Sequence, residues 1–312
     1  MISRKEFLKR GALLAAGATM PLGLTGKLLT PTASAITILY TNDTHARLDP
    51  FPENAVDYAG LGGIARRASL VKKIRTEQKN VLLLDAGDVF QGTPWFDVYG
   101  GKVDLKLMSE MGYDAMAVGN HEFDRGPDGF AEAADKTDFP ILAANYDAAG
   151  TPMNPYLRRL IVREMDGFRI GIFGLGIEFE GVIPSELHGG VKDRDPVAWA
   201  NGMTNSLRDY HKCDFIICLS HLGFQYNNGR MDDMKLAEKV AGIDLIIGGH
   251  THTFLDYPVG VVNPEGNVTQ ITQMGHGGVR LGRIDLDINS GNQKTKMSDR
   301  FYVIGEDFNL SS

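Results

Sequence analysis

Short apolar runs alternate with stretches of helical periodicity through the first half of the chain, a pattern that predicts repeated βαβ units. Ile64, Ala68 and Val71 recur at helical spacing and mark one face of a helix that ends near Gln78. We expect strands at 36–40, 81–84, 115–118, 141–144, 215–219 and 245–247, and further helices near 103–111, 130–136, 197–211 and 234–240. This order is typical of an α/β protein.

Two further regions of the chain have consecutive strands with no helix between them. We expect a β-hairpin formed by 157–165 and 168–175 that turns at Asp166-Gly167. We also expect a β-rich C-terminal region that includes 268–272 and 281–288. No repeat, low-complexity segment or linker interrupts the chain after residue 36. The pattern therefore predicts one α/β (α+β) domain over 36–312, built on two mixed β-sheets flanked by helices.

The first 35 residues read as an export signal. Four basic residues within 4–10 precede an apolar run at 11–24 that is too short to span a bilayer, and Ala33-Ser34-Ala35 suits signal peptidase. We predict a signal peptide over 1–35, cleavage after Ala35, and an exported periplasmic or extracellular protein with no membrane anchor after cleavage. The start resembles a twin-arginine signal, but Lys5 replaces the second Arg, so general secretion stays open, as does an uncleaved amphipathic helix.

The net charge of the chain limits the classes of partner that it can bind. The chain has 32 basic and 39 acidic residues, and removal of 1–35 takes away five basic residues and one acidic residue, which leaves a net charge of −11. Such an acidic body would repel a nucleic-acid backbone, so we expect no nucleic-acid polymer as partner. A bound phosphate must then be held by local positive charge, for which metal cations are the obvious source.

Polar clusters follow five of the predicted strands, at the carboxyl ends where ligands bind in open α/β sheets. These clusters are Asp43-Thr44-His45, Asp85-Ala86-Gly87-Asp88, Gly119-Asn120-His121-Glu122-Phe123-Asp124, Ser220-His221 and Gly248-Gly249-His250-Thr251-His252. One such cluster would more often cap a helix or close a turn. All five occur in order and hold five of the eight histidines, and carboxylate, amide and imidazole groups without thiolate predict a metal site.

This ordered set resembles the calcineurin-like metallophosphoesterases, and 119–124 with 248–252 resembles their 5′-nucleotidase branch, over essentially all of 36–312. The resemblance implies a four-layer αββα sandwich with a di-metal centre. By resemblance, one metal is held by Asp43, His45 and His252, the other by Asn120, His221 and His250, and Asp88 bridges both. Many members have Gln at the position of His252.

The residue types themselves indicate the chemistry of such a centre. Two divalent ions about 3.5–4 Å apart can share a water, make it a hydroxide near neutral pH and neutralise charge on a phosphoryl group. His121 follows a candidate ligand directly, so we expect its side chain to point elsewhere, with Asp124 fixing its tautomer and the ring protonating the leaving alkoxide. Turn-capping is the alternative for His121, and Asp85 is expected to close a turn.

Arg47 and His276 are weaker candidates for contacts with the substrate. Arg47 could meet a phosphate oxygen, although a solvated surface position is the alternative. His276 lies among glycines, in a loop that could border the cleft. Mixed nitrogen and oxygen ligands suit Zn²⁺, Mn²⁺ or Fe without choosing between them, whereas four imidazoles disfavour Ca²⁺. The expected cofactor is therefore a pair of divalent metal ions.

The resemblance favours hydrolysis of a small phosphorylated substrate, most directly a 5′-nucleotide, and a place in nucleotide catabolism. Full-length 5′-nucleotidases carry a C-terminal nucleotide-binding domain, and this chain ends about where that domain would begin. We therefore expect either a separate protein that supplies nucleotide recognition or a less selective enzyme. A 2′,3′-cyclic nucleotide phosphodiesterase, a UDP-sugar hydrolase and a thiosulfohydrolase-like enzyme are alternatives, as is a non-catalytic binding protein on a relic phosphatase fold.

Overall fold

The computed structural model describes residues 35–288 and 295–308, so the expected signal peptide lies outside the described residues except for Ala35. Two large mixed sheets form the centre of this part of the chain. In spatial order, the strands of the first sheet are β15 (Lys296–Val303), β14 (Arg280–Asp287), β1 (Ala35–Thr41), β2 (Asn80–Asp85), β3 (Ala115–Ala117), β4 (Ile141–Leu142) and β6 (Leu157–Arg158). Those of the second are β12 (Val259–Val262), β13 (Val268–Thr272), β11 (Leu245–Gly248), β10 (Phe215–Ser220), β8 (Phe168–Leu175) and β7 (Leu160–Met165). The short strands β5 (Tyr146–Asp147) and β9 (Lys192–Asp193) pair separately.

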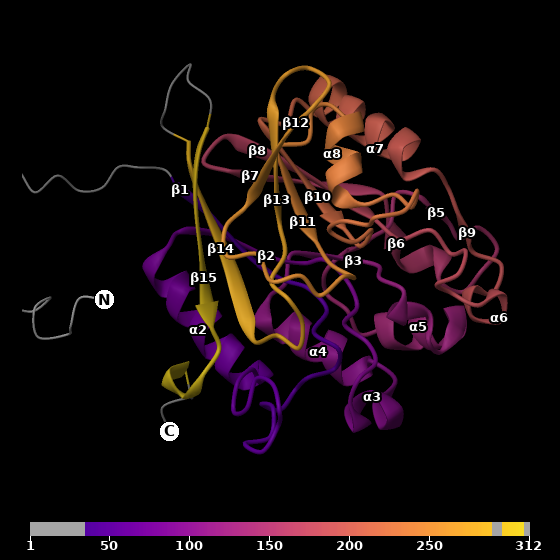
Figure 1. Cartoon of the computed structure of the whole chain (residues 1–312), viewed down its shortest axis with the longest axis vertical. Coiled ribbons are helices and arrows are strands. Elements are labelled where there is room, and N and C mark those ends of the chain that lie inside the picture. The colour runs from indigo at the N-terminus through magenta and orange to yellow at the C-terminus, as the bar shows by residue number, and fades with distance from the viewer. Residues whose placement is uncertain (1–34, 289–294, 309–312) are drawn as a thin grey trace, which may run out of the picture. The chain divides into compact units, whose positions relative to one another are not determined.

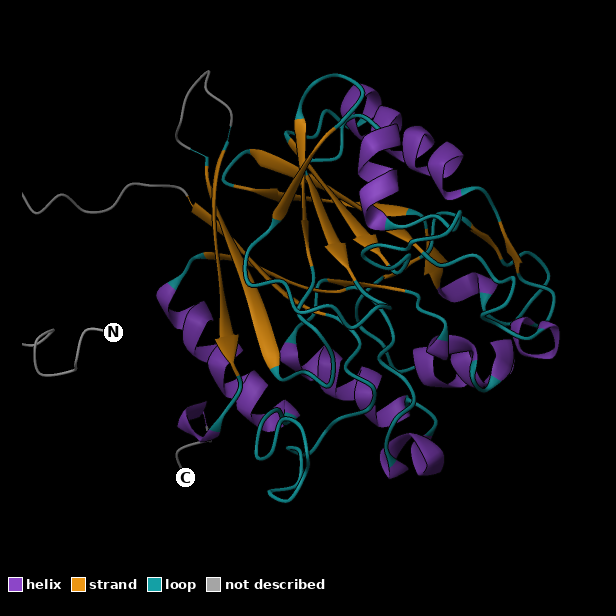
Figure 2. Cartoon of the chain, viewed as in Figure 1, coloured by secondary structure: helices purple, strands orange, loops and turns teal. Residues whose placement is uncertain are grey.

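Helices cover the outer face of each sheet (Figure 1). Those beside the first sheet are α2 (Ile64–Glu77), α3 (Pro94–Tyr99), α4 (Lys102–Met111) and α5 (Gly126–Ala134), and those beside the second are α7 (Pro196–Asn205) and α8 (Asp233–Lys239). Short α6 (Ser185–His188) lies next to α5. Figure 2 shows the strands gathered between the two sets of helices. The expected four-layer αββα sandwich of two mixed sheets is confirmed.

Strand alternation separates three apolar cores. In β1, Ile36 and Ile38 face the second sheet and pack with residues such as Ile217 of β10, whereas Leu39 points to the helices and packs with Leu70 of α2. A third core lies under α7 and α8. Because consecutive side chains of a strand point to opposite faces, apolar residues at both parities place β1 and β2 between two covered layers.

Most predicted elements are present, with differences at their ends. The hairpin is confirmed as β7 and β8, and both turn residues, Asp166 and Gly167, have the positive φ that a two-residue hairpin requires. The helix expected over 197–211 is α-helical from Pro196 to Asn205 and continues as a π turn, Ser206–Tyr210. Helix α3 and the exposed edge strand β15 were not predicted, because α3 is only six residues long and β15 is mostly polar. In the described ranges, no helix is long and apolar enough to cross a membrane.

Candidate metal centre

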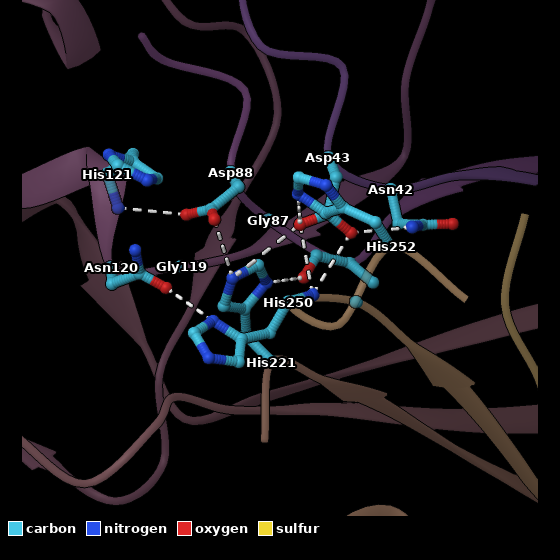
Figure 3. A network of polar contacts seen from close by, with 12 residues as sticks. Asn42, Asp43, Gly87, Asp88, Gly119, Asn120, His121, His221, His250 and His252 are labelled. Atoms are coloured by element: carbon cyan, nitrogen blue, oxygen red, sulfur yellow. Dashed lines mark hydrogen bonds and ion pairs between the residues drawn. The ribbon is translucent and has the colours of Figure 1, made fainter. Parts of the chain in front are cut away.

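Five loops from the two sheets meet at one place. Strands β1, β2 and β3 are parallel neighbours in the first sheet, and β10 and β11 are parallel neighbours in the second. Their carboxyl ends therefore point to the same edge of the sandwich. The seven candidate ligands lie on the loops that follow, which are Asp43 and His45 after β1, Asp88 after β2, Asn120 after β3, His221 after β10, and His250 and His252 after β11. Figure 3 shows side chains of this set turned toward one another.

The first group of ligand atoms comes from Asp43, His45 and His252. The Nε2 atoms of the two imidazoles lie 2.9 Å apart. Oδ1 of Asp43 lies 3.5 Å from Nε2 of His252 and 4.0 Å from Nε2 of His45. These spacings suit a single cation that binds nitrogen and oxygen at about 2.0–2.2 Å. The structure thus brings together the three residues that the resemblance assigned to one metal.

The second group comes from Asp88, His221 and His250, with Asn120 beside it. Oδ2 of Asp88 lies 3.0 Å from Nε2 of His221, and Nδ1 of His250 lies 2.7 Å from Oδ1 of Asn120. Oδ1 of Asp43 lies 3.9 Å from Nε2 of His221, so the two groups adjoin. All four residues assigned to the second metal, including the expected bridge Asp88, therefore lie in one cluster.

The loops hold strained backbone at the candidate ligands. Five of these residues have positive φ, namely Asp43 (48°), His45 (49°), Asp88 (56°), His250 (71°) and His252 (53°). Left-handed backbone costs a non-glycine residue roughly 1–2 kcal/mol and persists where surrounding contacts hold it. Here the Asp43 N–H donates to Gly87 O at 2.9 Å and the His45 N–H donates to Asp88 O at 3.1 Å. The two loops therefore brace each other, and these hydrogen bonds help to hold the left-handed backbone of Asp43 and His45.

Glycine lets two of these loops approach closely. A Cβ on Gly119 would lie 2.2 Å from Oδ1 of Asp88, and one on Gly87 would lie 2.7 Å from the backbone nitrogen of Gly119. Either side chain would force the loops after β2 and β3 apart. The glycines are therefore needed to keep Asp88 beside Asn120.

The charges and protonation of the candidate ligands suit the binding of cations. Nε2 of His221 is buried and has no hydrogen bond among the described residues, although two carboxylates lie near it. Burial lowers the pKa of His221, but the charge and proximity of Asp88, the charge of Asp43 and the contact with Ala86 O together raise that pKa to about 10. The carboxylates thus favour positive charge at this point. Burial and the His221 charge lower the pKa of His250 to about 4, which leaves a neutral imidazole able to bind metal.

His121 and Asp124 form a pair beside the ligands. Nδ1 of His121 lies 2.9 Å from Oδ2 of Asp124, and the His121 ring centroid is 5.4 Å from that of His45. The His121 N–H donates to Oδ1 of Asp88 at 2.8 Å, so its backbone is also tied to the centre. Burial acts to lower the pKa of His121, but the Asp124 hydrogen bond and nearby carboxylates raise it overall. Such a ring can carry a proton near neutral pH.

Asp85 lies behind the ligands, as expected of a residue that closes the turn. It accepts hydrogen bonds from the Thr41 hydroxyl at 2.6 Å and from the Gly87 N–H at 2.8 Å, and burial raises its pKa to about 7. Neither weaker substrate candidate points freely into the centre. The Arg47 guanidinium lies 4.2 Å from the centroid of the Phe51 ring, and the His276 ring stacks on His252.

Glu122 is a residue whose role the sequence did not reveal. Its buried carboxylate accepts four backbone N–H groups, from Asp88, Val89, Phe90 and Gly119. It therefore joins the loop after β2 to the loop after β3. Its place inside the 119–124 cluster is the only signal in the sequence, because the backbone groups that a carboxylate will receive cannot be read from residue types.

The four-layer sandwich and its two clusters of oxygen and nitrogen ligands define a candidate di-metal hydrolase. The chain belongs to the calcineurin-like phosphoesterase family, whose model matches residues 36–254. This membership confirms the family predicted from the sequence, and with the two ligand groups it makes the chain a metal-dependent phosphoric ester hydrolase.

Individual relatives agree with the branch of the family that was predicted. The 5′-nucleotidase of Homo sapiens is 35% identical over 88% of this chain and 50% of its own length. The trifunctional nucleotide phosphoesterase protein YfkN of Bacillus subtilis (strain 168) is 35% identical over 80% of this chain and 18% of its own length. The solved 5′-nucleotidase precursor from Thermus thermophilus matches with a TM-score of 0.79 and 32% identity, over 88% of this chain and 55% of that one. The chain thus spans about half or less of the curated relatives' length.

Proposed function

We propose that this chain hydrolyses the phosphate ester of nucleotides in the manner of a 5′-nucleotidase, with two divalent cations held by the seven candidate ligands. The observation that carries this proposal is the meeting of the two ligand groups with the His121–Asp124 pair at one edge of the sandwich. When bound, the cations supply Lewis-acid activation of water and of the phosphoryl group.

The protein residues have distinct tasks in this proposal. Asp88, the proposed bridge, belongs to the second group, with Oδ2 toward His221 and its backbone N–H held by Glu122. His121 receives its orientation from Asp124 and carries a proton that it donates to the leaving alkoxide oxygen. Asn120 offers a neutral oxygen, so the centre keeps enough positive charge to attract phosphate.

A stacked aromatic pair next to the centre supports a nucleotide as substrate. The rings of Trp95 and Tyr99 are 5.8 Å apart and nearly parallel, and they line a cavity of about 400 Å³ together with Arg47 and Asp49. The Thr93 hydroxyl donates to Ala46 O at 2.8 Å and so ties this cavity's wall to the residue after His45. We assign the cavity to the nucleobase, because bases stack on aromatic side chains.

The alternatives keep the same centre and differ in the leaving group. A 2′,3′-cyclic nucleotide, a UDP-sugar or a thiosulfate ester would meet the same cations, and the name of the Bacillus relative joins three nucleotide activities in one protein. In addition, we propose that a separate protein completes nucleotide recognition. A non-catalytic binding protein on a relic phosphatase fold is disfavoured, since every candidate ligand and both His121 and Asp124 are present.

Metal analysis combined with a substrate panel on the mature chain tests the function. We expect two equivalents of Zn²⁺, Mn²⁺ or Fe, with fastest release of phosphate from nucleoside 5′-monophosphates. Preference for cyclic nucleotides or UDP-sugars would replace the assigned substrate, and absence of all hydrolysis by the metal-loaded protein would refute the function. Tight, base-selective turnover by an isolated monomer would contradict the need for a partner protein.

We also propose that the chain is exported and matures by cleavage after Ala35. Residue 35 is the first of β1, so this cut would remove a single residue from that strand. N-terminal sequencing of the protein recovered from periplasm or medium should begin at Ile36. An intact residue 1 on protein outside the cytoplasm would contradict cleavage, and blocking the twin-arginine route separates the two export pathways.

A further inference from the structure

The candidate histidine ligands are held in different ways. Nδ1 of His221 lies 2.7 Å from Ala86 O, and Nδ1 of His45 lies 3.1 Å from Phe90 O. Histidines that bind metals almost always donate their second ring N–H to a carbonyl or carboxylate, which fixes the ring orientation. His221 and His45 follow this pattern, and Nε2 of each ring is left to face the centre.

His252 lacks that support. Its side chain is 41% exposed, against 12% for His45 and 0% for His221. Among the described residues, no carbonyl or carboxylate receives a hydrogen bond from its Nδ1, and the hydrogen-bond contact of its ring is between Nε2 and His45. An exposed imidazole without a fixed second nitrogen would rotate and bind a cation more weakly.

The ring of His276 lies against this ligand. The two ring centroids are 4.8 Å apart and the planes differ by 16°, a face-to-face stack. His276 is itself enclosed by three other rings, with centroids 5.2 Å away for Tyr58 and 6.2 Å away for both Phe51 and Phe254. Tyr58 contributes from a left-handed backbone conformation (φ 59°), which is a costly one for a bulky residue.

The loop that carries His276 is shaped for this packing. A Cβ on Gly275 would lie 2.1 Å from the Phe254 ring, and one on Gly277 would lie 2.7 Å from the Phe51 ring. The Gly277 N–H donates to Asp43 O at 2.7 Å, and the Asn42 side-chain amide donates to Gly275 O at 2.6 Å. These hydrogen bonds fix the loop to the segment that holds Asp43. The ring of His276 is thus in place before any cation binds.

We propose that His276 is a positioning residue whose ring stacks on His252 and aims Nε2 of that ligand at the cation site formed with Asp43 and His45. The stack takes the place of the carbonyl contact that holds His45 and His221. This inference depends on the proposed two-cation centre. It places the effect of His276 at one of the two cation sites, because His276 contacts neither His221 nor His250 in the described contacts.

Metal titration of three variants tests the proposal. Metal-free protein carrying His276→Ala, His276→Phe or His276→Leu is titrated with Mn²⁺ by calorimetry, and the two sites are followed by electron paramagnetic resonance. We expect His276→Ala and His276→Leu to lose about 10–100-fold in affinity at one site only. His276→Phe keeps a planar ring and should bind within a few-fold of wild type. His211→Ala, which removes a ring packed against Tyr210 away from the centre, is the matched control.

Two results would overturn the proposal, and they are distinguishable from failure of the function. One is wild-type affinity at both sites in His276→Ala. The other is a His276→Phe variant as weak as His276→Leu, a comparison that stands even where the alanine variant does not fold. Either result leaves a wild-type protein that binds two cations and hydrolyses nucleotides. A wild-type protein that binds no pair of cations would instead remove the centre on which both proposals depend.

Discussion

Glu122 holds the backbone of Asp88 through one of four hydrogen bonds to a single buried carboxylate. Its Oε2 accepts the Asp88 N–H at 3.0 Å and the Gly119 N–H at 2.6 Å, while its Oε1 accepts the N–H of Val89 and, at longer range, that of Phe90. The residue expected to bridge two cations therefore keeps its left-handed backbone because another acidic residue satisfies the amides around it.

Glu122→Gln should destabilise the protein and weaken metal binding. A glutamine side chain has one acceptor oxygen, so its NH₂ group would face backbone N–H donors that have no other partner. Each buried donor left without an acceptor costs roughly 1–3 kcal/mol. Urea unfolding of the metal-free variant measures the loss, and metal titration measures the effect on Asp88.

Glu132→Gln is the matched control for that experiment. Glu132 lies exposed on α5, where it pairs with Lys102 at 2.8 Å, and its replacement should leave unfolding unchanged. If Glu122→Gln unfolded at the same urea concentration as Glu132→Gln, the four hydrogen bonds would not be what holds the loops.

Asp88→Ala and His121→Ala should separate metal binding from proton transfer. Asp88 is the proposed bridge between the two cations and lies in the second ligand group, so its loss is expected to abolish both metal occupancy and activity. His121 directs its ring to Asp124, so its loss should keep both metals while kcat falls about 10²–10⁴-fold. Metal content by mass spectrometry and steady-state kinetics provide the two readouts. Loss of metal in His121→Ala would show that the imidazole is a ligand and not the proton donor.

The sequence was sufficient to predict the fold and the candidate ligands that the structure brings together, for a physical reason. Ligands such as Asp43, His221 and His250 directly follow apolar strands, and strand patterning specifies where the ends of parallel strands lie. Each candidate ligand lies within four residues of the end of its strand, so little freedom remains in the placement of its side chain. Asp85 was expected to close the turn, and it accepts a hydrogen bond from the Gly87 N–H there.

What the sequence did not reveal depends on contacts between distant segments. Glu122 acts through backbone amides, and His276 acts through the face of its ring, and neither interaction leaves a spacing pattern. Trp95 and Tyr99 are neighbours on α3, a helix too short to have a recognisable period. The stacked pair lies beside the loop of His45, through the Thr93 hydroxyl that donates to Ala46 O.

Trp95→Ala should weaken binding of nucleotides without affecting small phosphate esters. Stacking of one base on an aromatic side chain is worth about 1–3 kcal/mol, which corresponds to a rise in KM of roughly 5- to 150-fold for nucleoside monophosphates. KM for p-nitrophenyl phosphate should stay within about two-fold, since none of the residues that line the cavity with Trp95 is a candidate metal ligand.

Replacement of Trp199, the second tryptophan, allows base binding at Trp95 to be followed by fluorescence. Trp199 lies on α7 with the Arg159 guanidinium 4.5 Å from its ring centroid, and Trp199→Phe leaves Trp95 as the one remaining tryptophan. Nucleosides should quench the fluorescence of this variant, whereas ribose 5-phosphate should not. An equal rise in KM for nucleotides and p-nitrophenyl phosphate would mean that Trp95 acts through folding or metal binding. It would contradict the assignment of this cavity to the nucleobase.

Removal of the cations should lower stability in the metal-binding protein but not in Asp88→Ala. The candidate ligands come from five loops of two sheets, and five of these residues have left-handed backbone that bound cations would help to fix. A cation present at about 1,000 times its Kd stabilises the folded chain by about 4 kcal/mol. Thermal unfolding with and without a chelator should therefore show a clear fall in Tm for wild type, reversed by adding metal back. Asp88→Ala, with no occupied sites, should unfold at one temperature in both buffers. A wild-type Tm that ignores the chelator would mean that the loops converge without help from metal, and the strain at Asp43 and His250 would then need a purely protein-based explanation.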